Sequence, residues 1–213
     1  MYPTADIDLD PRLPPASGFE FWVPEPNEID EYEGFGNFRN VWAITDVSVS
    51  DAEAVVRQDK MLCRIVGDLA SDAIEFDDLA AAVEAGSADE IDGISGDHLA
   101  ILTRHLTGEV ALEGLEAGVA GLVYALSAAG MYPAASCRGH PGPDPWSPFP
   151  VVIFAVDRPH AEALQQLVRN NGCGFATDPR RPGLLAINGR SVQETLSLAD
   201  AVLGSIRVFN SLR

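Results

Sequence analysis

The 213-residue chain contains few of the residues that usually mark a function. It has three cysteines, four histidines and a single lysine. Three cysteines in a chain of this length do not make a disulfide framework, and they indicate a reducing compartment. No apolar run is long enough to cross a bilayer. The first thirty residues lack the basic and apolar regions of a signal peptide, so we expect a cytoplasmic protein without membrane contact.

The common catalytic and nucleotide-binding motifs are absent as well. The sequence has no Walker A loop, no G-x-S-x-G elbow, no H-E-x-x-H helix and no zinc-deaminase pattern. Gly172-Cys173-Gly174 is not a dinucleotide fingerprint, because no strand–turn–helix context surrounds it. These absences assign no cofactor, and they leave both an enzyme and a binding protein open.

Positive charge is scarce in the first half of the chain. Residues 1–100 contain 23 acidic and 5 basic residues, whereas residues 101–213 contain nine of each. The net charge of −18 therefore comes from the first half alone. Such an acidic face either only solvates the protein or meets a basic partner. It opposes binding to a phosphate backbone, so nucleic acid is not an expected partner.

The first half of the chain predicts mostly helical structure. Residues 1–18 are rich in proline and have no period, which indicates a disordered tail. Residues 19–106 predict an acidic, mostly helical region with a short hairpin. Its expected elements are strands at 19–23 and 41–49, a helix that begins at a capping box of Ser50 and Glu53, a helix at about 76–85 and a helix at 95–108.

The second half predicts an α+β sandwich domain over residues 107–213. Its expected elements are a long helix at 109–129, strands at 131–136 and 151–156, a helix at 159–171, strands at 173–177 and 184–188, and a helix from Ser191 to about Phe209. This α-β-β-α-β-β-α order builds an antiparallel sheet with helices on one face, a two-layer sandwich. Gly114, Gly118 and Gly121 share one face of the long helix and indicate close packing there. One domain and two domains both fit this pattern.

The most unusual stretch is AASCRGHPGPDPWSPFP, residues 134–150. Short connections make consecutive elements antiparallel, and this brings the end of strand 131–136 beside the end of strand 184–188. The edge of the sheet is then expected to gather eight candidate site residues: His105, Glu109, Cys137, Arg138, Gly139, His140, Arg190 and Ser191. Arg180 and Arg181 follow strand 173–177 at the opposite end, where they indicate a solvated turn.

An anion site is the first interpretation of this edge. Arg138 and Arg190 would clamp a phosphate or carboxylate beside the helix N-terminus at Ser191. Gly139 would let backbone N–H groups face the ligand. The proline-rich loop that follows suits either the wall of a pocket, with Trp146 as an apolar contact, or a rigid connector.

Cys137 and His140 allow two further interpretations. Cys137 is a candidate nucleophile if its pKa is lowered, or else a buried wall, and His140 is then the acid/base. Cys-x-x-His is also half of a zinc pattern. The second half of that pattern is missing, so we assign no metal; if a metal binds, Cys137 and His140 are its ligands.

Two resemblances involve this turn. ALSAAGMYPAASCRGHP resembles a Ser-Cys-x-Gly-His turn module of uncharacterised bacterial proteins, matched by Ser136, Cys137, Gly139 and His140. ASCRGH and LLAINGRSVQETLSLADAVL also resemble segments of wybutosine-synthesis methyltransferases of the third-step type. That likeness would imply a methyl-donor cofactor and tRNA binding. His140 stands where that family has the final arginine of its turn.

Two functions from different classes follow from the sequence. The first is a protein with a small anionic-ligand site around Cys137–His140, or an enzyme whose active site there acts on a phosphate- or carboxylate-bearing substrate. The alternative is an acidic inhibitor, immunity or scaffold subunit that binds a basic protein partner through residues 1–100.

Overall fold

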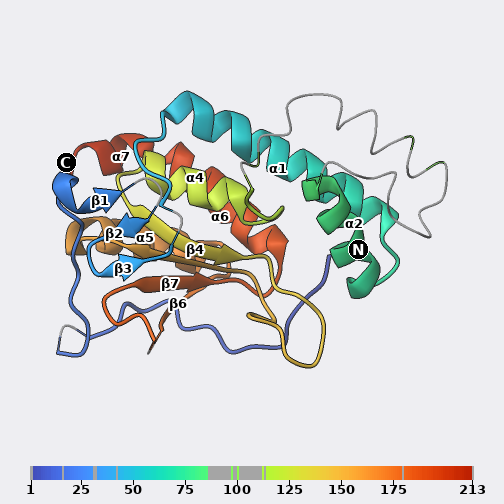
Figure 1. The fold of residues 1–213 in the computed structure, drawn as a ribbon, viewed down its shortest axis with the longest axis horizontal. Coiled ribbons are helices and arrows are strands. Elements are labelled where there is room, and N and C mark those ends of the chain that lie inside the picture. The colour runs from blue at the N-terminus through green and yellow to red at the C-terminus, as the bar shows by residue number, and fades with distance from the viewer. Residues whose placement is uncertain are drawn as a thin grey trace.

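A four-stranded antiparallel sheet forms the centre of the molecule (Figure 1). The computed structural model describes the following residues: 2–15, 17–30, 33–41, 43–85, 97, 100, 112, 114–178 and 180–212. The strands lie in the spatial order β4 (Tyr132–Cys137), β5 (Val151–Ala155), β7 (Leu185–Asn188) and β6 (Gly174–Thr177). Together with the helices, this sheet confirms the predicted α+β class.

The register of the sheet places the ends of its strands as the sequence predicts. Cys137 pairs with Val151, Val151 pairs with Asn188, and Asn188 pairs with Gly174. The end of β4 and the end of β7 therefore lie on either side of the start of β5. This register brings the loop that follows Cys137 to the same edge as the segment that leads into the last helices.

The α-helices pack on one face of the sheet or on one another. They are α1 (Val49–Leu69), α2 (Ala73–Ala85), α4 (Ala120–Ala128), α5 (Arg158–Asn170), α6 (Val192–Gly204) and α7 (Ile206–Asn210). Alternate residues of β5 and β7, such as Phe154 and Ile187, point into the core that α4, α5 and α6 cover. Helix α1 packs on α4 and α6 (Figure 1). None of the described helices is both long and apolar enough to span a bilayer.

The opposite face of the sheet is covered by a small second sheet. It follows a 3-10 turn (Pro26–Glu28) and consists of β1 (Ile29–Asp30), β2 (Gly34–Phe35) and β3 (Phe38–Arg39). Phe35 is fully buried and belongs to the core that includes Ile153 and Ala186. The fold thus gains a third layer where this small sheet lies.

The hairpin predicted in the first half is wrong in its position. Trp22 makes a single bridge to Val156 in place of the strand predicted at 19–23. The described residues of 41–48 form no strand. Asn40 and Asp46 have positive φ angles of 60° and 55°, which interrupt an extended chain. The alternation of apolar and polar residues here reflects a coil that buries Ala43 against residues of the sheet.

The predicted long helix at 109–129 is also wrong, because the described helix, α4, begins only at Ala120. Gly114 and Gly118 have positive φ angles of 78° and 95°, so the chain through Glu116 is a loop. The expected close packing holds at Gly121, where a Cβ atom would lie 3.2 Å from Val56 Cα of α1.

The limits of two other helices differ from those predicted. Helix α1 is capped by Ser48, whose hydroxyl accepts the Asp51 N–H at 3.1 Å, so it begins before the predicted capping box of Ser50 and Glu53. The last predicted helix is divided at Ser205 into α6 and α7.

The two halves of the chain share their cores. Leu62 and Val66 of α1 belong to one buried cluster with Ala120 of α4 and Leu196 of α6. Most of the helix predicted at 95–108, with the boundary near Leu106, lies outside the described residues.

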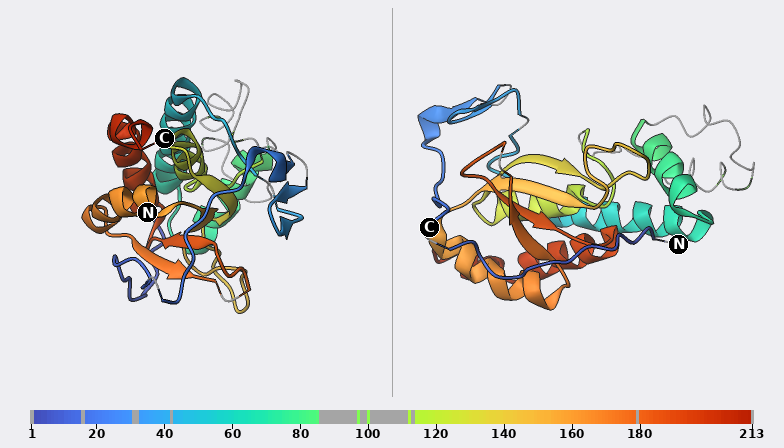
Figure 2. Two further views of the ribbon diagram at one scale, coloured as in Figure 1. Left: turned by 90° about the vertical axis from the view of Figure 1, so that its left-hand side faces the viewer. Right: turned by 90° about the horizontal axis from the view of Figure 1, so that it is seen from below.

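The N-terminal segment runs along the molecule (Figure 2, right). The Ala5 N–H donates to the Arg190 carbonyl at 2.7 Å, and the Phe175 N–H donates to the Asp10 carbonyl at 2.7 Å. The Tyr2 ring lies 6.0 Å from the Phe76 ring of α2. The described part of residues 1–18 thus contacts β6, α2 and the segment before α6, and the disorder of this tail stays a prediction.

Candidate functional site

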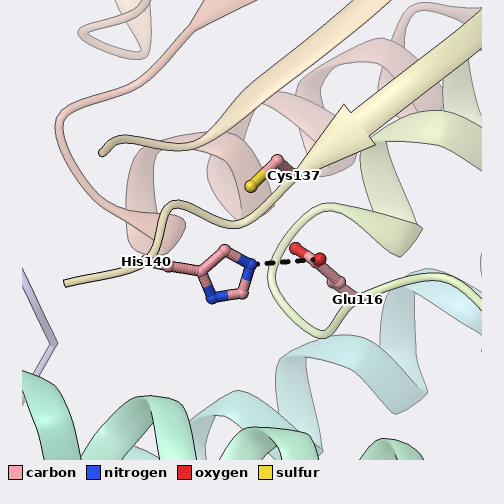
Figure 3. Close-up of side chains that lie close together, drawn as sticks. All are labelled: Glu116, Cys137 and His140. Atoms are coloured by element: carbon pink, nitrogen blue, oxygen red, sulfur yellow. Dashed lines mark hydrogen bonds and ion pairs between the residues drawn. The ribbon is translucent and has the colours of Figure 1, made fainter. Parts of the chain in front are cut away.

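The candidate site lies where β4 ends and the proline-rich loop begins. Cys137 is the last residue of β4, and His140 follows it in the loop. Glu116 reaches the same place from the loop before α4, and its carboxylate faces the His140 ring (Figure 3). The three side chains thus come from two segments that only the fold brings together.

Two carboxylates hold the His140 ring. Its Nδ1 lies 2.9 and 3.0 Å from the two carboxylate oxygens of Asp77 in α2, and its Nε2 lies 3.2 Å from Oε1 of Glu116. Partial burial lowers the pKa of His140, but its hydrogen bonds with Asp77 and the charges of Glu116 and Asp77 outweigh burial and raise it overall. The ring is therefore fixed in orientation from both sides.

The surroundings of Cys137 are the reverse of what a nucleophilic cysteine needs. Its side chain is buried, and burial raises the pKa of the thiol to about 11. The Gly139 N–H donates to Sγ at 3.3 Å and lowers the pKa, whereas the nearby Glu116 carboxylate raises it. In the protein without a bound cation the thiolate is disfavoured, so the described neighbours of Cys137 do not activate it as a nucleophile.

Arg138 does not form the predicted anion clamp, because acidic side chains already surround its guanidinium. It is 3% exposed, its Nε donates to Asp77 Oδ1 at 2.8 Å, and its Nη1 pairs with Glu84. Burial lowers the pKa of Arg138, but these carboxylates raise it overall. Burial also raises the pKa of Glu84 to about 7, although Arg138 opposes that change. Arg138 is a structural cation that fixes α2 against the loop.

Arg190 and Ser191 lie at the predicted edge but in different roles. The Arg190 side chain donates to the Gly172 carbonyl at 3.3 Å and lies 3.6 Å from Glu194. Ser191 precedes α6, and its hydroxyl makes no capping hydrogen bond. Arg138, His140 and Arg190 line one small cavity of about 180 Å³, which the N-terminal segment also lines. The predicted juxtaposition is present, with both guanidinium groups already bonded to protein acceptors.

Gly139 is required where the chain turns from Cys137 to His140. Its φ angle is 85°, and a Cβ atom there would lie 2.6 Å from the Phe149 backbone. The turn is closed by the His140 N–H, which donates to the Ser147 carbonyl at 3.0 Å. The proline-rich loop is thus tied back on itself directly beside the site.

Replacing Gly139 with alanine is expected to destabilise the fold strongly. A positive φ costs a side-chain-bearing residue about 1–3 kcal/mol, and the contact with Phe149 adds about 1–3 kcal/mol of overpacking. Gly142→Ala is the matched control, since Gly142 also has a positive φ angle but no atom within 4 Å of its Cβ position. Urea denaturation of both variants measures the difference, and equal losses would show that the Phe149 contact is unimportant.

A cavity of about 410 Å³ opens beside these residues. Glu116, Cys137 and His140 line it together with Trp146 and Arg181. Much of the remaining lining is apolar: Val41, Ile44, Leu115, Val123, Pro133, Ala134 and Ala135. A larger cavity of about 940 Å³, beside Trp22 and Phe38, has neither histidine nor cysteine among its described lining residues. The smaller cavity therefore combines titratable side chains with room for a small molecule.

Three of the side chains around this cavity could hold a metal ion. One ligand atom each from Glu116, Cys137 and His140 lies within 4.8 Å of the other two. The sequence identified Cys137 and His140 but not Glu116, because a helix was predicted at 109–129 where the structure has a loop. Asp77 and Glu84 were also missed. Their spacing of seven residues on one helix was a usable signal, since it puts both on the same face.

Two predicted site residues, His105 and Glu109, lie outside the described residues. Comparisons with protein families, with curated protein sequences and with solved structures found no match. The two resemblances of the turn therefore stay predictions, and the interpretation of the site rests on its geometry.

Proposed function

We propose that the protein binds a small molecule in the cavity beside Cys137 and His140, and that this ligand has an apolar body and one carboxylate or phosphate group. One observation carries the proposal. The same cavity is lined by a largely apolar wall and by the cationic side chain of Arg181. Pockets of this size with a few polar groups on an apolar lining are typical of small-ligand sites.

Arg181 takes the anion-binding role that the sequence gave to Arg138 and Arg190. Its Nη1 donates to Asp178 at 3.1 Å, and its guanidinium carbon lies 5.8 Å from the centre of the Trp146 ring. A guanidinium has five N–H groups in a planar fork, so the bond to Asp178 leaves it able to donate to an anionic ligand as well. The half-exposed Trp146 ring supplies an apolar surface next to this charge.

A pair of matched probes tests the proposal. 3-Phenylpropionate has an apolar body and a carboxylate, and 3-phenylpropanamide has the same shape without the charge. We expect isothermal titration calorimetry to show binding of the acid and at least about tenfold weaker binding of the amide, because charge-assisted hydrogen bonds contribute about 1.5–3 kcal/mol. Arg181→Gln is expected to remove this preference.

Arg180→Gln is the control for that substitution. Arg180 is the residue next to Arg181 in the same turn after Asp178. Its side chain is exposed and does not line the cavity. It should leave the preference for the acid unchanged. Equal binding of acid and amide, an unchanged preference in Arg181→Gln, or no binding of either probe would contradict the proposal.

A further inference from the structure

Three side chains of different chemistry converge on one point of the cavity wall. The ligand atoms of Glu116, Cys137 and His140 lie within 4.8 Å of one another. Bonds of about 2.0–2.3 Å to tetrahedral zinc place neighbouring ligand atoms roughly 3.3–3.7 Å apart. The 3.2 Å between His140 Nε2 and Glu116 Oε1 is already close to that spacing. Closing the remaining separations requires side-chain shifts of at most about 1.5 Å.

A second set of hydrogen bonds orients each converging atom. Asp77 faces His140 Nδ1, and in the neutral ring this bond puts the proton on Nδ1 and the lone pair on Nε2. The backbone N–H of Arg138 donates to Glu116 Oε2 at 2.6 Å, so the other oxygen, Oε1, faces His140. The Gly139 N–H donates to Cys137 Sγ. Carboxylate–histidine–metal chains of this kind orient the ligands in metalloproteins.

With the ring in that tautomer, His140 Nε2 and Glu116 Oε1 are both acceptors. The Nε2 lone pair faces a carboxylate oxygen at 3.2 Å, an arrangement that is repulsive unless a cation lies between the two atoms. The competing arrangement is a doubly protonated His140 that bridges Asp77 and Glu116 as a plain ion pair. The two arrangements differ in whether the site binds a metal ion, so they can be separated by measurement.

We propose that Glu116, Cys137 and His140 bind one divalent transition-metal ion, with zinc the best chemical match. A thiolate, an imidazole and a carboxylate suit zinc and cobalt, whereas magnesium and calcium select oxygen ligands. The carboxylate and thiolate charges would balance the charge of the ion. All three residues line the 410 Å³ cavity, so a fourth coordination position faces it. Three protein ligands with an open fourth position are typical of catalytic rather than structural zinc sites.

The proposed metal site does not depend on whether the cavity binds a carboxylate at Arg181. A metal ion there would supply a Lewis acid for a group that enters the cavity. In that case His140 is a metal ligand rather than the acid/base that the sequence suggested. Cys137 is then a ligand rather than a wall or a nucleophile.

Cobalt substitution of the 213-residue chain tests the inference. The protein is stripped with a chelator, titrated with Co²⁺ and followed by absorption, and a parallel sample is reconstituted with Zn²⁺ and analysed for metal content. We expect one equivalent of zinc, the d–d bands of four-coordinate cobalt and a thiolate-to-cobalt charge-transfer band. Cys137→Ser should remove the charge-transfer band and weaken zinc binding at least 100-fold.

Two further variants sharpen the result. Cys173→Ser is the matched control, because Cys173 is also buried and reduced but lies in the core on the helical face of the sheet. It should keep the full cobalt spectrum. Asp77→Asn changes no ligand but removes the carboxylate behind His140, and it should weaken zinc binding about 10–100-fold.

The wild-type protein alone can overturn the inference, even if a variant fails to fold. A zinc content below about 0.2 equivalents after reconstitution, or bound cobalt without a charge-transfer band, would show that the cluster is only an ion-pair network. A Cys137→Ser protein that retains the band would contradict it equally. Loss of carboxylate binding in Arg181→Gln leaves all these readings unchanged, so failure of the ligand proposal and failure of the metal site are distinguishable.

Discussion

Replacing Arg138 with methionine is expected to lower the free energy of unfolding by about 3–5 kcal/mol, the usual cost of removing one partner of a buried ion pair. The Arg138 side chain is 2% exposed, and the carboxylates of Asp77 and Glu84 beside it are only 22% and 19% exposed. Without the guanidinium these two groups remain close together in a poorly solvated place. The variant should therefore also loosen α2 from the loop that carries His140.

Two further variants separate the effect of removing the Arg138 charge from the effect of changing its packing. Glu84→Gln in the Arg138→Met background removes one unpaired carboxylate and should recover part of the lost stability. Arg190→Met removes an arginine whose side chain is 41% exposed, with Glu194 at 3.6 Å, and should cost no more than about 1 kcal/mol. Urea denaturation of the four proteins gives the comparison. If Arg138→Met costs no more than Arg190→Met, the buried ion pairs do not hold α2 in place.

Stability is expected to decrease as the pH rises from about 4 to about 6, with a contribution of about 3 kcal/mol from Asp59 alone. Asp59 of α1 is fully buried, and burial raises the pKa of its carboxyl to about 6. The N–H groups of Gly118 and Gly121, at 2.6 and 2.8 Å, oppose that shift without cancelling it. The thiol of Cys63 and the charge of Arg138 also lower this pKa.

The direction follows from where the proton is held. Between the ordinary carboxyl pKa near 4 and the folded value of about 6, the folded state keeps the proton on Asp59 and the unfolded state releases it. The folded state therefore binds more protons in this range. The stabilisation by the protonated carboxyl is complete below pH 4 and is lost as the pH rises through 6.

Asp59→Asn should remove this part of the pH dependence, because its side chain keeps an acceptor for the α4 loop but does not titrate. The measurement is the free energy of unfolding of wild type and variant at pH 4, 5, 6 and 7. Asp68→Asn, an exposed position on the same helix, is the control and should follow the wild-type curve. A wild-type curve parallel to that of Asp59→Asn would contradict the prediction.

From β4 to β7, the elements of the second half could be predicted from the sequence to within a residue or two. Val151 to Ala155 is an uninterrupted buried strand, and Asp157 and Pro159 mark the start of α5. Local signals of this kind fix the order of elements, and the order fixes which strand ends meet. The order of elements therefore predicts that the end of β4, at Cys137, lies near the segment that contains Arg190, and the register of the sheet agrees.

The first half could not be predicted in the same way, because its structure depends on contacts with the second half. The two-residue strands β1 to β3 have no length over which a period can be recognised. Phe35 is buried because Ile153 and Ala186 lie across from it. The loop at Glu116 depends on Gly118, whose backbone is held by Asp59 from a different helix. Contacts between residues so far apart in the chain cannot be predicted from a short stretch of sequence.

The roles of the site residues changed for an electrostatic reason. The sequence shows an excess of acidic residues in the first half, and it predicts that Arg138 and Arg190 of the second half bind an anionic ligand. In the folded chain, Asp77 and Glu84 from the acidic half neutralise Arg138 and contact His140. Some of the acidic residues of the first half thus form ion pairs with basic residues of the second half of the same protein.

The path of the N-terminal segment has a consequence for association between molecules. Strand β6 is an edge of the central sheet, with β7 on one side only. Its Phe175 N–H donates to Asp10, and a Cβ atom at Gly174 would lie 2.8 Å from the Asp10 backbone. Exposed edges are templates for strand addition by other chains and for aggregation. Because the N-terminal segment lies on β6, it shields this edge from a second molecule. The segment is itself a poor template for strand addition, because its prolines cannot donate hydrogen bonds to a neighbouring strand.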